Sequence, residues 1–122
     1  MSASEHMKLY EARINLHRFD EVEPLISPEA VFWFTDGTHR GIDEIRAAFE
    51  RTWQTLQNEA YWLENLEWIG LGETLASCTY RFCRKAEIDG KTFEGKGRGT
   101  TVLRKELRQW KIVHEHLSRF PN

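Results

Sequence analysis

The 122-residue chain lacks most features that mark a special class of protein. It has two cysteines and three prolines, and 17 Lys and Arg residues face 19 Asp and Glu residues, for a net charge of −2. Without a basic stripe, a nucleic-acid partner is not expected. No apolar run approaches the roughly 20 residues of a membrane span. The N-terminus also lacks the apolar core of a signal peptide, so we expect a cytoplasmic protein with no membrane partner.

The two cysteines and the length limit the architecture further. Cys78 and Cys83 are five positions apart on one predicted strand and point to opposite faces, so they cannot bridge each other. A chain of this length can bury roughly two-thirds of its unfolded surface in one core. Residues 1–122 are therefore predicted to form a single domain, with no repeat or linker.

The order of expected elements predicts an α+β fold. Ser2 and Glu5 have the spacing of a capping box, and helical spacing continues from Met7 to Phe19. Helices come first and long strands follow, which is the segregation typical of this class. The later elements, in order, are a short helix from 20, strands over 30–34 and up to 41, an amphipathic helix over 42–56, and strands over 60–71 and 74–86.

The last third predicts two consecutive antiparallel hairpins. Asp89-Gly90 is a strong mark of a two-residue turn that needs positive φ, and a second turn is expected at Leu107-Arg108. This register places Phe82 opposite Gly97 and Tyr80 opposite Gly99, so that aromatic rings cover glycines. In the second hairpin it places Thr101 opposite His114 and Gly99 opposite His116.

Two histidines on the last strand are the first candidates for chemistry. His114 and His116 share strand parity with Trp110 and Ile112, so we expect both rings to face the helix-covered interior. Imidazoles titrate near neutrality, which suits proton transfer, and Tyr10 could donate to a developing oxyanion. We therefore predict His114 as acid or base and Tyr10 as hydrogen-bond donor. A metal site or hydrogen-bonded core positions are the alternatives.

A metal is not expected. A zinc site needs at least three protein ligands, and Cys78 is predicted to lie two strands from the histidines, on the order of 10 Å away. We expect no cofactor.

The aromatic residues predict a pocket for a small organic ligand. Five tryptophans are spread over four expected elements; most should be core, and some could line a cavity for a flat apolar compound. Arg13 and His17 near it would favour a carboxylate or an enolate. The candidate ligand-binding residues are Arg13, His17, Phe32, Phe34, Trp53, Trp62, Tyr80, Thr101 and His116.

The opposite sheet face is predicted to form a homodimer, with a solvated surface as the alternative. This face mixes charge with apolar side chains, which makes it too apolar to stay fully wet. The candidate interface residues are Arg81, Arg98, Val102, Val113, Glu115 and Leu117. A β-bulge at Gly95, Gly97 or Gly99 would reverse these facings.

Four segments together resemble the nuclear transport factor 2-like superfamily over nearly the whole chain. They are HRFDEVEPLIS, EAVFWF, DGTHRG and GRGTTVLRKELRQWKIVHEHLS. The chain looks most like its SnoaL-like and ketosteroid-isomerase-like group of small bacterial proteins. The W-x-x-V-H-x-H ending is similar to the association domain of calcium/calmodulin-dependent kinases. This resemblance implies a cone-shaped barrel, in which a strongly bent antiparallel sheet packs against N-terminal helices and leaves a pocket at the open end.

The resemblance carries over only in part at the level of residues. Tyr10 falls where ketosteroid isomerases have an oxyanion-donating tyrosine, but Phe34 occupies the position of their catalytic carboxylate. A phenyl ring cannot carry a proton, so steroid isomerisation is not implied. The expected function is a small-molecule-binding domain that could isomerise, dehydrate or cyclise an enolisable compound. The alternative is an association module without catalytic activity, because this fold hosts both.

Overall fold

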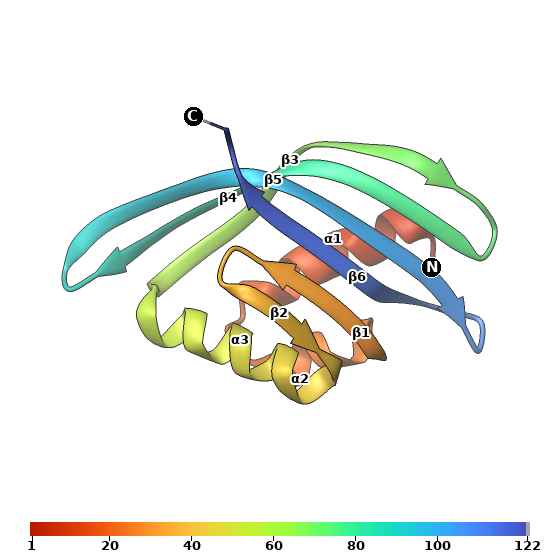
Figure 1. Cartoon of the computed structure of the whole chain (residues 1–122), viewed down its shortest axis with the longest axis horizontal. Helices are drawn as coiled ribbons and strands as arrows, with labels where there is room; N and C mark the ends of the chain where they lie inside the picture. The colour runs from red at the N-terminus through yellow and green to blue at the C-terminus, as the bar shows by residue number, and fades with distance from the viewer. Residues whose placement is uncertain (122) are drawn as a thin grey trace.

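The computed structural model describes residues 1–121, and its architecture is α+β, as predicted. Figure 1 shows the long strands arching over the helices, which lie on the concave side of the bent sheet. The elements are α1 (Ala3–Ile14), α2 (Phe19–Val22), the 3-10 helix η1 (Glu23–Leu25), β1 (Ile26–Phe34), β2 (Gly37–Arg40), α3 (Gly41–Thr55), β3 (Gln57–Leu71), β4 (Leu75–Ile88), β5 (Lys91–Glu106) and β6 (Gln109–Arg119).

Helix α1 begins with the predicted capping box. The Glu5 backbone N–H donates to Ser2 Oγ at 3.1 Å, and the Ser2 N–H donates to Glu5 Oε1 at 3.0 Å. The helix ends at Ile14 and not at Phe19, because the backbone turns at His17, where φ is 57°. The buried stripe of α1 includes Tyr10 and faces the sheet.

The six strands form one sheet in the order β2-β1-β6-β5-β4-β3, antiparallel except for the parallel pair β1–β6. Both predicted hairpin turns are confirmed. Asp89 and Gly90 have φ of 51° and 78°, and Leu107 and Arg108 have φ of 50° and 68°, as a two-residue turn with both central residues at positive φ requires.

The glycines of β5 allow aromatic rings to lie across the concave face. Phe82 pairs with Gly97 and Tyr80 pairs with Gly99, as the sequence predicts. A Cβ atom on Gly97 would overlap both the Phe82 ring and the Ser118 carbonyl oxygen. The missing side chains therefore give the rings of β4 their places in the core.

One register shift separates the structure from the prediction. Leu103 pairs with Ile112 as expected, but Val102 pairs with His114, so Val113 is an extra residue in β6. A bulge of this kind reverses the facing of every later side chain on its strand. Thr101 consequently lies opposite Glu115, so its predicted pairing with His114 is wrong.

The bulge also corrects the predicted facings beyond it. Gly99 pairs with Leu117, and His116 pairs instead with Thr100. Glu115 and Leu117 are buried, at 2% and 6% exposure, whereas His116 is exposed. The prediction placed the two histidines inside and these two residues outside, and the reverse is observed.

Replacing Gly97 with alanine tests the close packing of β4 on β5. We expect Gly97→Ala to lower the free energy of unfolding by about 1–3 kcal/mol, because the new methyl group overpacks a filled site. Gly70→Ala is the matched control, since a Cβ there meets no atom within 4 Å. Urea denaturation of both variants checks this, and equal stability of the two would contradict it.

Candidate functional site

Glu115 is a buried carboxylate held by three hydroxyl groups. Tyr10 Oη of α1 donates to Glu115 Oε2 at 3.2 Å. Tyr80 Oη of β4 and Thr101 Oγ1 of β5 each lie 3.3 Å from Oε1, and 2.7 Å separates these two hydroxyls. Four elements therefore meet at one carboxyl group.

Burial and hydrogen bonding act in opposite directions on Glu115. Loss of water around the buried carboxyl raises its pKa from 4.5 to about 7, although the three hydroxyls and the charge of Arg84 favour the ionised form. Burial also raises the pKa of Tyr10 and of Tyr80 well above 10, so both phenols keep their protons. A carboxyl group poised near neutrality can both accept and return a proton.

Glu115 lies at the wall of a cavity of about 280 Å³. Six of the lining residues are aromatic, with the rings of Phe34 and Phe49 5.8 Å apart and those of Phe49 and Trp53 5.5 Å apart. The lining residues are Ile14, Phe34, Thr35, Asp36, Phe49, Thr52, Trp53, Glu59, Tyr61, Phe82, Arg84, Phe93, Gly95, Lys96, Glu115, Leu117 and Arg119.

A second carboxylate and an arginine face the same cavity. Arg84 Nε lies 3.5 Å from Glu59 Oε2, and the Glu59 side chain is only 2% exposed. Neither atom has a hydrogen-bond partner within the described residues, so this ion pair is poorly aligned. Burial raises the pKa of Glu59, and the charges of Arg84 and His17 oppose that rise.

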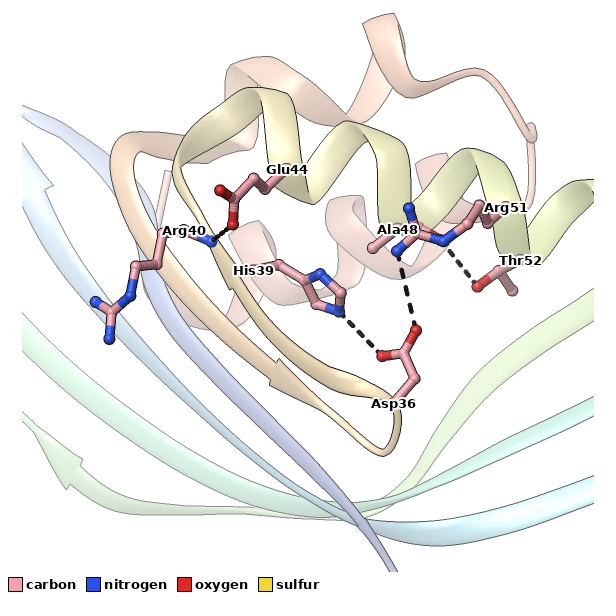
Figure 2. A network of polar contacts seen from close by, with 7 residues as sticks. All are labelled: Asp36, His39, Arg40, Glu44, Ala48, Arg51 and Thr52. Atoms are coloured by element: carbon pink, nitrogen blue, oxygen red, sulfur yellow. Dashed lines mark hydrogen bonds and ion pairs between the residues drawn. The ribbon is translucent and has the colours of Figure 1, made fainter.

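A polar network fixes the turn between β1 and β2 at the cavity rim. Figure 2 shows the Asp36 carboxylate between His39 and Arg51. Asp36 Oδ1 lies 3.0 Å from His39 Nε2, and Oδ2 lies 4.0 Å from Arg51 Nη2 of α3. The Arg40 N–H donates to Glu44 Oε1 at 2.8 Å, which also ties β2 to α3.

Two of the predicted ligand-binding residues, Phe34 and Trp53, line the cavity. Tyr80 and Thr101 do not line it, but both are hydrogen-bonded to Glu115, which does. Phe32 is fully buried in the core, at 0% exposure. The predicted aromatic wall and the predicted tyrosines therefore meet in the structure. The residue that joins them is Glu115, a carboxylate that was predicted to lie on the other face of the sheet.

The remaining predicted ligand-binding residues have other partners. Arg13 Nη1 donates to the Glu21 carbonyl oxygen at 3.0 Å. His17 Nε2 lies 2.8 Å from the Glu59 carbonyl oxygen, with its ring beside Trp53. Trp62 Nε1 donates to Glu64 Oε2 at 3.0 Å. None of the three lines the cavity, so their predicted placement there is wrong.

His114 and His116 lie on the convex face of the sheet. Their rings pack edge-on against Trp33, at centroid distances of 4.7 and 5.3 Å, and His114 Nδ1 contacts the Val31 carbonyl oxygen. The predicted convergence of His114 with Tyr10 and Tyr80 on one cavity is therefore wrong, because the bulge at Val113 turns the ring outward.

The predicted interface residues divide between the two faces. Arg81 and Arg98 line a groove on the convex face, and Val102 pairs there with His114. Val113, in the bulge, is half-buried. Glu115 and Leu117 line the inner cavity, so their predicted place on the convex face is wrong.

Glu59, Arg84 and the role of Glu115 were not predicted from the sequence. A usable sign existed for Arg84, which shares strand parity with Tyr80 and Phe82.

Within residues 1–121, no three His, Cys, Asp or Glu side chains are grouped so as to hold a metal ion. Of the helices in that same range, none has the length and apolar character to cross a membrane.

The raised pKa of Glu115 predicts a pH-dependent stability. Between pH 4.5 and about 7 the folded state retains a proton that the unfolded state releases, so stability falls as pH rises through this window and levels off above it. From pH 5 to pH 8, we expect this residue to lower the free energy of unfolding by about 2–3 kcal/mol. Glu115→Gln should lack that loss.

Chemical denaturation of the wild type and the variant at both pH values measures this difference. Glu73→Gln, a change at an exposed position between β3 and β4, is the control and should follow the wild type. Parallel pH dependence of the wild type and Glu115→Gln would contradict the assignment.

Comparison with known structures supports the fold. A nuclear transport factor 2-like superfamily protein from Salmonella enterica serovar Typhimurium superposes with a TM-score of 0.88 at 23% identity, covering 97% of this chain and 88% of that one. A protein from Novosphingobium aromaticivorans, provisionally assigned as a scytalone dehydratase, gives a TM-score of 0.82 at 15% identity, with coverages of 98% and 83%. A provisionally assigned ketosteroid isomerase from Shewanella frigidimarina gives 0.78 at 18% identity, with coverages of 97% and 95%.

These identities establish a shared fold and not a shared activity. No curated protein matches the chain significantly. The SnoaL-like domain family matches residues 6–122, which is nearly the whole sequence. The chain therefore belongs to the SnoaL-like domain family, within the nuclear transport factor 2-like fold.

Proposed function

We propose that the cavity binds a small hydrophobic, enolisable compound and that Glu115 moves a proton to or from one of its carbon atoms. The observation that carries this proposal is a carboxyl group with a pKa of about 7 at the wall of an aromatic cavity. General bases work best when their pKa lies near the working pH. Isomerisation, dehydration and cyclisation all begin with this proton transfer.

The reaction would start from the ionised form of Glu115. Its carboxylate takes a proton from a carbon next to a carbonyl group, and the electron pair of the broken C–H bond moves onto the carbonyl oxygen as an enolate. Return of the proton to a different carbon gives an isomer. Departure of a β-hydroxyl group, protonated to water by the Glu115 carboxylic acid, gives a dehydrated product. Attack of the enolate carbon on a second carbonyl carbon of the same molecule closes a ring; the π electrons of that carbonyl move onto its oxygen, which takes the proton from the Glu115 carboxylic acid.

The residues around Glu115 would divide the remaining work. Tyr10, Tyr80 and Thr101 do not line the cavity and act as positioning residues that orient the carboxylate. The guanidinium of Arg84 lies on the cavity wall, where its positive charge favours the developing enolate. Aromatic walls exclude water, which strengthens that electrostatic interaction.

Hydrogen exchange on a model ketone tests the proposal. In D2O, the wild type should speed deuterium uptake at the α-carbons of 2-tetralone, measured by NMR, and the rate should rise with pH through about 7 as Glu115 ionises. Glu115→Gln should lower the rate at least about 100-fold, in line with the usual contribution of a general base.

His116→Ala is the matched control, because His116 is the residue next to Glu115 on β6 and its ring lies on the opposite face of the sheet. Its exchange rate should equal that of the wild type. The proposal fails if exchange is no faster than in buffer, or if Glu115→Gln exchanges as fast as the wild type.

A second proposal concerns association through the convex face of the sheet, where two copies would form a homodimer. Trp33 and Phe120 remain 44% and 39% exposed, which is high for aromatic residues. Glu67 and Arg98 line the same groove, and neither has an ion-pair partner within the described residues. A two-fold axis would place Arg98 of each copy near Glu67 of the other, a self-complementary arrangement.

Sedimentation velocity tests this proposal. The wild type should sediment as a dimer, and Arg98→Glu should sediment as a monomer with unchanged circular dichroism, because it sets like charges against each other. Lys8→Glu makes the same charge change on an exposed position of α1 and should remain dimeric. A monomeric wild type would rule out this interface.

A further inference from the structure

We infer that Arg84 and Arg119 form an anion-binding subsite at the mouth of the cavity, and that the compound bound there is a small planar acid with a carboxylate group. The inference rests on the proposed function only for the location of the site. It adds the chemical class of the ligand and the direction in which the ligand enters.

The register of three strands brings the two arginines to one end of the cavity. Arg84 lies on β4 opposite Gly95, and Arg119 lies on β6 opposite Gly97. The two glycines belong to β5, the strand between them, so no side chain of that strand separates the arginines on the inner face. Both arginines line the cavity.

Arg84 is held in place before any ligand arrives. Its guanidinium carbon lies 5.5 Å from the Tyr61 ring centroid and 5.4 Å from that of Phe82, within the range of cation–π contacts. Its side chain is only 22% exposed. A guanidinium restrained by two rings loses little freedom when it binds a carboxylate, which favours affinity.

The existing partner of Arg84 leaves its binding capacity largely unused. Glu59 Oε2 lies 3.5 Å from Arg84 Nε, without hydrogen-bond geometry. Among residues 1–121, no protein acceptor is hydrogen-bonded to the two terminal nitrogens of Arg84. A planar carboxylate can take two parallel hydrogen bonds from a guanidinium, and the poorly aligned Glu59 does not.

The charges at the mouth favour an anion. Arg84, Lys96 and Arg119, which all line the cavity, contribute three positive charges, and Glu59, whose pKa is raised by burial, contributes at most one negative charge. The third carboxylate at the rim, Asp36, already contacts His39 and Arg51. An anionic ligand would therefore complete the charge balance of this end of the cavity.

The shape and length of the cavity suggest how such an acid would lie. Its volume of about 280 Å³ is just below the roughly 300–1,000 Å³ typical of ligand pockets, which suits a compound of one or two rings. Glu115, Leu117 and Arg119 alternate along one face of β6, so the Cα atoms of Glu115 and Arg119 are roughly 13 Å apart at about 3.3 Å per residue. The carboxylate would sit at the mouth and the reacting carbon near Glu115.

Calorimetric titration with two probes of the same shape tests the subsite. The probes are trans-cinnamate and the uncharged cinnamamide. The wild type should bind cinnamate at least about tenfold more tightly than the amide, since a charge-assisted hydrogen bond is worth at least that factor. Arg84→Met and Arg119→Gln should each weaken cinnamate binding about tenfold and leave the amide unaffected.

Arg40→Gln, at an exposed position outside the cavity lining, is the matched control and should bind both probes as the wild type does. Thermal unfolding checks that each variant folds. If Arg84→Met fails to fold because Glu59 loses its partner, then Arg119→Gln, at an exposed position, decides the matter. Equal affinities of the wild type for acid and amide, no binding of either probe, or an equal loss in Arg40→Gln would overturn the inference.

The result is separable from the proposed proton transfer. Glu115→Gln should keep the preference for cinnamate, because the substitution leaves both arginines of the subsite in place. A preserved preference together with no deuterium exchange would reject the catalytic proposal and keep the subsite. A lost preference together with intact exchange would do the opposite.

Discussion

The burial of one carboxyl group constrains the rest of the structure. An uncompensated charge at Glu115 would be costly, whereas a fully compensated carboxylate would stay ionised at all relevant pH values. Hydrogen bonds from Tyr10, Tyr80 and Thr101 bring the balance to a pKa of about 7. These donors come from α1, β4 and β5. This balance requires that α1 docks on the sheet, that β4 and β5 pair in the observed register, and that β6 contains its bulge. The same contacts therefore determine both the site and the fold.

Local sequence signals were sufficient to predict the architecture. A capping box at Ser2, a turn at Asp89-Gly90 and the pairing of Phe82 with Gly97 each depend on neighbouring or directly opposed residues, and all three are confirmed. The facing of the last strand depends on one extra residue, and strict alternation cannot reveal such an insertion. The sequence still carried a trace of it. Apolar residues occupy even positions at Trp110 and Ile112 and odd positions at Val113 and Leu117, so the alternation changes parity within β6.

The choice between Arg13 and Arg84 shows a second limit of sequence reasoning. Arg13 lay between two apolar stripes of the first helix, which made it a candidate for an anion. In the structure the carbonyl oxygen of Glu21, eight residues away, accepts from it, so its polar group is already satisfied. Arg84 has only a poorly aligned partner and faces the cavity. Which charged residue finds a partner depends on tertiary contacts, and neither composition nor periodicity contains them.

The bulge at Val113 separates the two activities that this chain could have. It turns Glu115 and Leu117 toward the cavity and turns His114 and His116 onto Trp33 at the convex surface. The proposed proton transfer and the proposed association therefore use opposite faces of one strand, and adjacent residues belong to different surfaces. Neither proposed activity requires a change in the side chains of the other face. Because Glu115 and His116 point to opposite faces of the sheet, their substitutions should affect the two proposed activities nearly independently, which a site formed on a single face would not allow.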